Sequence, residues 1–458
     1  MTPAPGQAPE ADISVLRLLP EPLAKRCRIF PTGLDPFGRL LLAMENPMDF
    51  ELVNELQASL GLDIIPVAAT HQELDHWIRS RYRGTSASAP ASHDRGNPVV
   101  RMVDDIIAST IQSGASDIHI EPYERETVVR IRIDGQLREI KRVSRRLSLE
   151  LVSRIKIMAS LDIAERRRPQ DGAIRYASGG RSFDIRVSAI PTEHGQKLVL
   201  RILDRSGAEL DMDSLELGEH NRRLLDTCIE RPHGMVLVTG PTGSGKTTTL
   251  YSLVKSLRSP SLNISTIEDP IEYRMDGITQ TAVNPKIGLD FATCLRTLLR
   301  QDPDVILVGE IRDHETAELA IRAALTGHLV LSTLHTNDAP TAIARLTDMG
   351  IEPFLIASSL QLVVAQRLVR RRCPECGGRL STKCGLCGGS GYFGRIGLFE
   401  CMPVDTTLRE AIHARATTEQ LRTIATAAGM RTLLEDGLVK ASNGLTTESE
   451  VKREASAP

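Results

Sequence analysis

A glycine-rich loop carries the most specific chemical pattern in the chain. The octapeptide GPTGSGKT follows the apolar run MVLVT and precedes the helical pattern TTTLYSLVKSL. Its glycines let backbone N–H groups turn inward around phosphate oxygens, and the following helix adds the positive end of its dipole. Lys246 would reach the β- and γ-phosphates, and the hydroxyl of Thr247 would ligate Mg²⁺. The nucleotide-binding residues expected from this pattern are Gly240, Pro241, Thr242, Gly243, Ser244, Gly245, Lys246, Thr247 and Thr248.

Three further polar side chains come at points where apolar runs end. Glu268 ends ISTIE, Glu310 follows DVILV, and His335 ends LVLSTLH. Because open α/β sheets bind ligands outside the carboxyl ends of their strands, we expect these groups at one edge. Glu310 would lie near the γ-phosphate and hold Mg²⁺ through water, while Glu268 would orient and polarise the attacking water. Asp304 precedes the same strand, so it is the poorer metal candidate.

Four of the eight cysteines form two CxxC pairs within one short segment: Cys373, Cys376, Cys384 and Cys387. Each CxxC turn can present two thiolates to one ion, and four thiolates complete the shell of a structural Zn²⁺ site. A disulfide framework would not concentrate half of its cysteines in this way, so the cluster indicates a metal site in a reducing compartment. Four unligated thiols or a redox pair are the alternative.

The composition excludes several classes of protein. Of the 458 residues, 41% are hydrophobic and 25% are charged, which is ordinary for soluble domains. The net charge of −2 gives no overall attraction to polyanions, and 3% aromatic residues leave little for stacking on single-stranded nucleic acid. The longest stretch without charged residues, 323–337, is too short to span a bilayer, and the start of the chain lacks a signal-peptide pattern. We therefore expect neither a membrane-spanning nor an exported protein.

The elements that position these groups change character along the chain. Residues 14–80 alternate short apolar runs with a helical pattern at FELVNELQASLGL, which indicates a small α+β module. A Ser-, Ala-, Gly- and Pro-rich linker follows at residues 84–98. Beyond it we expect a helix at VRMVDDIIASTIQSG, a hairpin at TVVRIRIDGQLREI and two strands at FDIRVSAI and KLVLRIL. From Gly234, apolar runs alternate with helical patterns, which predicts a parallel sheet covered by helices on both faces.

Charge is unevenly distributed over these elements. From Arg130 to Arg186 there are 15 Lys and Arg against 7 Asp and Glu, either a solvated face or a surface that meets phosphate. A second basic run precedes the cysteines: Arg367, Arg370, Arg371 and Arg372. This run could contact acidic lipid or a partner, or form a solvated edge.

Several of these segments resemble one known family, the secretion superfamily of traffic ATPases. GPTGSGKT, TIEDPIEY, RQDPDVILVGEIRD and LTGHLVLSTLHTNDA are similar to its Walker A, Asp box, Walker B and His box. In that family Walker B ends in Gly-Glu, which agrees with Glu310 rather than Asp304. SDIHIEPYERETVVRIRIDG and FDIRVSAIPTEHGQKLVLRIL resemble its second N-terminal domain, where arginines at the positions of Arg186 and Arg201 are implied to contact nucleotide phosphates. Gln196 stands where the family usually has Glu.

The resemblance implies a fold, a catalytic set and cofactors. The fold is α/β: a RecA-like P-loop motor, a preceding α+β (PAS-like) domain, a small N-terminal α+β module and a tetracysteine zinc insertion. ATP, Mg²⁺ and Zn²⁺ are the cofactors, and the catalytic residues are Glu268, Glu310, His335, Arg186 and Arg201. The expected parts are a partner-docking module at 1–83, the linker at 84–98, the domain with arginine fingers at 99–204, a hinge at 205–220, the ATPase core at 221–372, the zinc module at 373–400 and a helical region at 401–458.

The function implied is that of a cytoplasmic ATPase, peripheral to the inner membrane, that drives pseudopilus assembly and protein export by type II secretion. A homo-hexamer is implied, and the N-terminal module would dock to the cytoplasmic part of a membrane component. The type IV pilus extension ATPase is the nearest alternative, since retraction ATPases are implied to lack the extra module and the tetracysteine element. A nucleic-acid translocase and a small-molecule kinase are less consistent, because neither a base-reading motif nor an acceptor pocket is visible.

Overall fold

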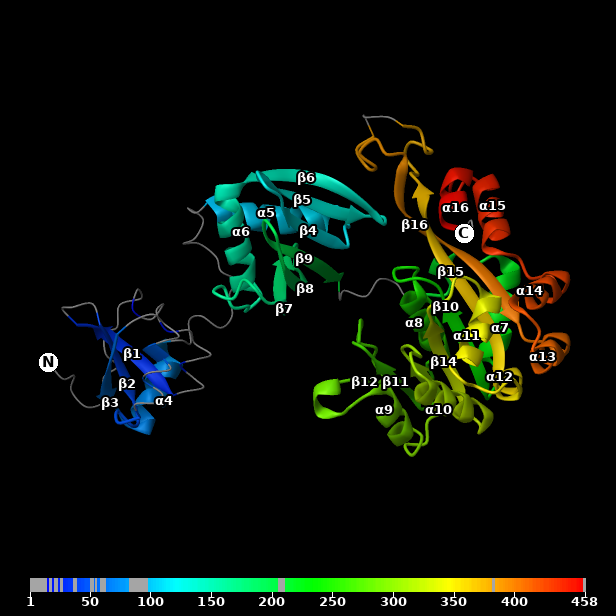
Figure 1. Cartoon of the computed structure of the whole chain (residues 1–458), viewed down its shortest axis with the longest axis horizontal. Coiled ribbons are helices and arrows are strands. Elements are labelled where there is room, and N and C mark those ends of the chain that lie inside the picture. The colour runs from blue at the N-terminus through cyan, green and yellow to red at the C-terminus, as the bar shows by residue number, and fades with distance from the viewer. Residues whose placement is uncertain are drawn as a thin grey trace. The chain divides into compact units, whose positions relative to one another are not determined.

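The computed structural model describes residues 15, 19, 24, 28–35, 39–49, 53, 56–57, 63–81, 98–204, 211–380 and 384–455. The chain divides into two compact units, Met1–Asn97 and Pro98–Pro458. The described residues form three separate sheets (Figure 1), so the chain is an α/β protein, as predicted. The predicted linker lies outside the described residues except for Pro98, which begins a helix. Within the described part of the chain, every helix is too short or too polar to cross a bilayer.

The N-terminal unit contains a three-stranded sheet and a helix: β1 (Ile29–Leu34), β2 (Leu40–Met44), β3 (Ile64–Ala68) and α4 (His71–Arg81). The central strand β2 pairs antiparallel with β1 and parallel with β3. Phe30 and Trp77, with ring centroids 5.8 Å apart, join the sheet to the helix in the core. Two of the short apolar runs noted in this part of the sequence, RLLLAM and LDIIPV, contain β2 and most of β3, whereas most of the helix expected at FELVNELQASLGL lies outside the described residues.

A six-stranded antiparallel sheet, in the order β6-β5-β4-β9-β8-β7, begins the second unit. Its elements are α5 (Pro98–Gln112), β4 (Asp117–Pro122), β5 (Glu126–Ile133), β6 (Gln136–Ser144), α6 (Arg145–Met158), β7 (Gln170–Ser178), β8 (Arg181–Thr192) and β9 (Gly195–Asp204). Asp134 and Gly135 join β5 to β6 with φ of 49° and 83°, as a type I′ hairpin turn requires. The predicted helix, hairpin and pair of strands are therefore all present in this segment.

The largest sheet has seven strands in the order β12-β11-β13-β14-β10-β15-β16. All neighbouring pairs are parallel except β15 with β16. Its strands are β10 (Gly234–Thr239), β11 (Ile264–Glu268), β12 (Thr279–Ala282), β13 (Val305–Val308), β14 (Leu329–Leu334), β15 (Leu360–Arg372) and β16 (Tyr392–Pro403). Every residue of β10, β11, β13 and β14 is buried, because apolar clusters cover both faces of the sheet.

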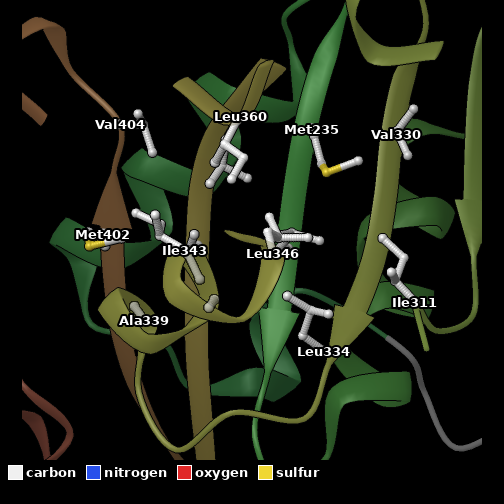
Figure 2. Packing of buried hydrophobic residues seen from close by; sticks show 14 of the residues in the cluster. Met235, Ile311, Val330, Leu334, Ala339, Ile343, Leu346, Leu360, Met402 and Val404 are labelled. Atoms are coloured by element: carbon white, nitrogen blue, oxygen red, sulfur yellow. The ribbon is translucent and has the colours of Figure 1, made fainter. Parts of the chain in front are cut away.

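Helices cover this sheet on both faces. They are α7 (Glu219–Ile229), α8 (Lys246–Leu257), α9 (Phe291–Leu298), α10 (His314–Leu325), α11 (Ala339–Asp348), α12 (Pro353–Ser359), α13 (Thr406–His413), α14 (Thr418–Ala427), α15 (Leu433–Ser442) and α16 (Glu448–Ala455), with 3-10 turns η1 (Asp213–Leu215) and η2 (Pro285–Ile287). Figure 2 shows one face of the packing, where Ala339, Ile343 and Leu346 of α11 lie against residues from β10, β14, β15 and β16. Their spacing of four and three residues places them on one side of the helix.

The domain limits in the second unit differ from those expected. β16 returns to pair with β15, so the cysteine segment ends at residue 391 rather than 400. Leu408, Leu421 and Val451 from the C-terminal helices are buried in the same core as β10, which makes residues 401–455 part of the motor. Met212 is buried in the core on the other face, while residues 205–210 of the predicted hinge lie outside the described residues.

Candidate nucleotide site and metal centre

A pocket of about 560 Å³ lies at the carboxyl ends of β10, β11, β13 and β14. These strands are neighbours and run parallel, so the segments that follow them meet at one edge. The sequence-predicted residues that line the pocket are Thr242, Gly243, Ser244, Gly245, Lys246, Thr247, Thr248, Glu268, Glu310, His335, Arg186 and Arg201. Gly240 and Pro241 are not among the lining residues, although their carbonyl groups contact Lys246.

The backbone of the glycine-rich loop excludes side chains where it curls. Gly240, Gly243 and Gly245 have φ of 148°, 81° and 91°, in the range that glycine adopts without strain. A Cβ atom at Gly240 would lie 2.5 Å from the carbonyl oxygen of Gln366, and one at Gly245 would lie 2.7 Å from its side-chain nitrogen. α8 begins at Lys246, within the loop motif, with Gly245 as its N-cap, so its free N–H groups face the pocket.

Two side chains of the glycine-rich loop, Lys246 and Ser244, make no hydrogen bond to an anionic group of the described residues, as a phosphate would provide. Lys246 Nζ donates to the carbonyl oxygens of Gly240 at 2.8 Å and Pro241 at 3.0 Å. Burial lowers the pKa of Lys246 to about 8, against the opposing effect of Glu310. The hydroxyl of Ser244 is buried without a hydrogen-bond partner. These groups fit the phosphates of a nucleotide, and the exposed hydroxyl of Thr247 fits a ligand of Mg²⁺.

Glu310 and His335 meet at the edge of the sheet. His335 Nε2 lies 3.5 Å from Glu310 Oε2, and Arg312 Nη2 lies 2.6 Å from Glu310 Oε1. Burial, reinforced by the nearby ammonium of Lys246, lowers the pKa of His335, so its imidazole is neutral at neutral pH. Asp304 lies at the opposite end of β13, where its carboxylate accepts a hydrogen bond from the backbone N–H of Asn263 at 2.7 Å. The geometry therefore agrees with Glu310, rather than Asp304, as the carboxylate at the phosphates.

Glu268 is held more tightly than the sequence suggests. Its side chain is 4% exposed, and Oε1 accepts hydrogen bonds from Thr266 Oγ1 at 2.6 Å and Gln280 Nε2 at 3.1 Å. Oε2 accepts a hydrogen bond from the hydroxyl of Tyr251, which is fully buried in α8. The strand that carries Glu268 is thus joined to the helix that begins at the glycine-rich loop. Sequence analysis missed Tyr251 because its position fits an ordinary apolar face of a helix.

Arg186 and Arg201 lie directly opposite each other on β8 and β9. Like charges in this arrangement repel, and Asp117 offsets the charge of one of them, because Arg201 Nε donates to Asp117 Oδ1 at 3.0 Å. Both arginines are exposed, and both line the pocket. Arg312 and Arg395 also line it and were not predicted, since nothing in their local sequence distinguishes them from surface residues.

The four clustered cysteines form a compact group at the turn between β15 and β16. Their sulfur atoms all lie within 4.8 Å of one another, and the pairs Cys373–Cys384 and Cys376–Cys387 are 3.7 Å apart. A tetrahedral ion with Zn–S bonds of about 2.3 Å places its sulfur atoms about 3.8 Å apart. Donor type, number and spacing therefore fit Zn²⁺.

We expect the purified chain to carry about one Zn²⁺, because four thiolates complete its shell without another ligand. Elemental analysis should find the metal in the wild type and in Cys294→Ala, a buried cysteine outside the cluster, and should find it reduced in Cys384→Ala. Absence of metal from the wild type, with all eight thiols open to titration, would contradict the assignment.

The basic run before the cysteines is not a free surface. Arg370 bonds the carboxylate of Glu450, and Arg371 Nη1 lies 2.6 Å from Glu216 Oε1. Arg367 is 8% exposed and donates to the carbonyl oxygen of Asn337. Three of the four arginines are thus engaged within the chain, which leaves less positive charge for an acidic lipid or a partner than the sequence suggests.

Comparison with known proteins shows a similarity to one family that covers most of the chain and not only the residues of the site. The family model described as "Type II/IV secretion system protein" matches residues 92–453. The chain belongs to this family. A second model, "MshEN domain", matches residues 5–88. The resemblance to secretion ATPases, predicted from four motifs, is thus confirmed.

Relatives within the family agree on the enzyme class. Type II secretion system protein E of Dickeya dadantii (strain 3937) is 52% identical over 78% of this chain and 75% of that protein. Type II secretion system ATPase E of Vibrio cholerae serotype O1 is 49% identical over the same shares. Type IV pilus assembly ATPase PilB of Myxococcus xanthus is 42% identical over 96% of this chain and 87% of that protein. This member of the family is therefore an ATP-hydrolysing secretion ATPase.

Solved structures show the same fold. The pilus retraction motor PilT with bound ADP has a TM-score of 0.54 and 29% identity, over 77% of this chain and 97% of that chain. The ATPase DotB of Legionella pneumophila has a TM-score of 0.60 and 24% identity, over 80% of this chain and 97% of that chain. The family's motor architecture thus extends to this secretion ATPase.

Proposed function

We propose that the chain hydrolyses ATP to drive pseudopilus assembly and protein export by a type II secretion system, as a peripheral protein of the inner membrane. The observation that carries this is the pocket, which gathers the phosphate loop with the predicted pair of carboxylates, the predicted imidazole and the two predicted arginines. The names of the relatives support the type II machine in particular. The type IV pilus extension ATPase is a second candidate, because PilB matches almost the whole chain.

The residues of the pocket divide the reaction between them. Lys246 and the loop amides would bind the β- and γ-phosphates, and Thr247 would ligate Mg²⁺, which neutralises charge that develops on the phosphates. Glu310 would hold the same ion through water. Glu268 would polarise the attacking water, with Tyr251 as the residue that positions it. His335, neutral and beside Glu310, would donate a hydrogen bond near the γ-phosphate.

Lys246→Ala tests this proposal at its centre. We expect nucleotide to bind about 10- to 100-fold more weakly, because a charged donor to the phosphates is lost. In a host that lacks its own secretion ATPase, the wild-type gene should restore export of secreted proteins and the Lys246→Ala gene should not. Restoration of pili instead of export would favour the second candidate. Lys255→Ala, at the far end of α8, is the matched control and should behave as wild type.

The N-terminal module is proposed to dock to the cytoplasmic domain of an inner-membrane platform protein. Every predicted phosphate contact lies in the second unit, so a chain without residues 1–83 should keep its basal ATPase activity. It should fail to co-sediment with membranes that contain the platform protein, and export should stop. A truncated chain that still co-sediments would contradict the docking role.

A further inference from the structure

A second cavity lies in the domain of the six-stranded sheet. Its volume is about 320 Å³, and its lining comes from α6, the segment that follows α6 and the turn between β8 and β9. It shares no lining residue with the nucleotide pocket. Ligand pockets span about 300 to 1,000 Å³, so this one suits a small molecule.

Lys156 of α6 is a buried cation at this cavity with neutral partners. Its side chain is 1% exposed, and Nζ donates to the backbone carbonyl oxygen of Glu165 at 2.7 Å and to Gln196 Oε1 at 3.0 Å. Among the described residues, no carboxylate lies within ion-pair distance of this ammonium. Burial lowers the pKa of Lys156, with Asp162 opposing, as expected of a cation that lacks a counter-ion. A buried charge of this kind is costly until an anion reaches it.

The side-chain amide of Gln196 provides a second hydrogen-bond donor next to the ammonium of Lys156. Gln196 Oε1 accepts a hydrogen bond from Lys156, and the buried Nε2 of the same amide has no hydrogen-bond partner. Gln196 itself is 8% exposed. An ammonium carries three N–H donors, of which two are used here. The remaining N–H of Lys156 and the amide of Gln196 match the two oxygens of one carboxylate.

The rest of the lining combines positive charge with apolar surface. Arg145 and Arg166 line the cavity, against a single lining carboxylate, Glu193, which is exposed. Leu149 and Ile163 also line it and are 56% and 40% exposed, so the cavity offers apolar surface beside its positive charge. A ligand that consisted of the anionic group alone would leave the side chains of Leu149 and Ile163 exposed to water.

We propose that this cavity binds a small carboxylate that carries a short apolar group. The carboxylate contacts Lys156 and Gln196, and the apolar group covers Leu149 and Ile163. This assigns the secretion ATPase a ligand site separate from its nucleotide site. The proposal does not depend on which machine the enzyme drives.

Saturation-transfer NMR on the full chain, with ADP saturating the nucleotide site, tests the proposal. Butyrate is the probe, and butyramide is a neutral molecule of the same shape. We expect the wild type to transfer saturation to butyrate with a millimolar dissociation constant and to show no saturable binding of butyramide. Equal transfer to both molecules, or none to butyrate, would overturn the proposal.

Variants separate this site from general attraction to cations. Gln196→Glu supplies Lys156 with a carboxylate from within the chain, so butyrate should bind at least about tenfold more weakly while ADP binding stays unchanged. Lys156→Met should do the same, and Lys141→Met, which removes an exposed cation outside the cavity in the same domain, should bind as wild type. If Gln196→Glu bound butyrate as tightly as wild type, the ammonium of Lys156 would not be the anion's partner.

Discussion

Glu310→Gln should leave nucleotide bound and almost unhydrolysed. The glutamine keeps the size of the side chain but removes the negative charge that contacts Arg312 and His335 and that we propose to hold Mg²⁺ through water. Groups that act on proton transfer or metal position in the transition state contribute about 10² to 10⁴ in rate. We therefore expect turnover to fall by about that factor. The affinity for ATP, measured by fluorescence of a labelled nucleotide, should change severalfold at most.

Asp304→Asn is the matched control for this change. It is the same exchange of carboxylate for amide on the same strand, at the end away from the pocket. Its turnover should stay near that of the wild type. If Glu310→Gln hydrolysed ATP at the wild-type rate, or if Asp304→Asn were the inactive variant, the assignment of the carboxylate at the phosphates would be wrong. Glu268→Gln should also lose turnover, with Mg²⁺ binding more nearly intact.

The parts of the site that sequence predicted are those fixed by short stretches of chain. A glycine-rich loop between strand and helix specifies its own conformation, and parallel strands bring their carboxyl ends to one edge whatever covers them. Glu268, Glu310 and His335 could therefore be placed together from three apolar runs. The two cysteine pairs are similarly local, and their sulfur atoms lie at the spacing of one ion.

The parts that sequence missed depend on contacts between distant segments. Arg370 was expected at a surface, but its partner Glu450 lies 80 residues further along the chain on α16. Tyr251 reaches Glu268 only because α8 packs against the strand that ends there. The cysteine segment is shorter than predicted, because β16 begins at Tyr392 and pairs with β15 immediately after it. Local sequence patterns predict helices and strands well, whereas side-chain partners and the ends of inserted segments depend on tertiary packing.

Arg201→Ala should cost far more turnover than nucleotide affinity. Arg186 and Arg201 lie opposite each other on β8 and β9, and both line the pocket, so their guanidinium groups could meet negative charge on the γ-phosphate. Arginine fingers contribute about 10³ to 10⁵ in rate where they act on a γ-phosphate. We expect steady-state turnover of Arg201→Ala to fall within that range, with ATP affinity within about tenfold of wild type.

Arg132→Ala is the matched control for this prediction. Arg132 Nε lies 3.8 Å from the same Asp117 that binds Arg201, yet Arg132 does not line the pocket, so its loss should leave most of the turnover.

Mixtures of variants test which subunit each arginine serves in a proposed ring of six. Arg186 and Arg201 line the pocket of their own chain, so Arg201→Ala mixed with Glu310→Gln should remain inactive. If the mixture recovered activity, each subunit would be lending its arginines to a neighbour. Closure of this domain on ATP would then couple one subunit to the next.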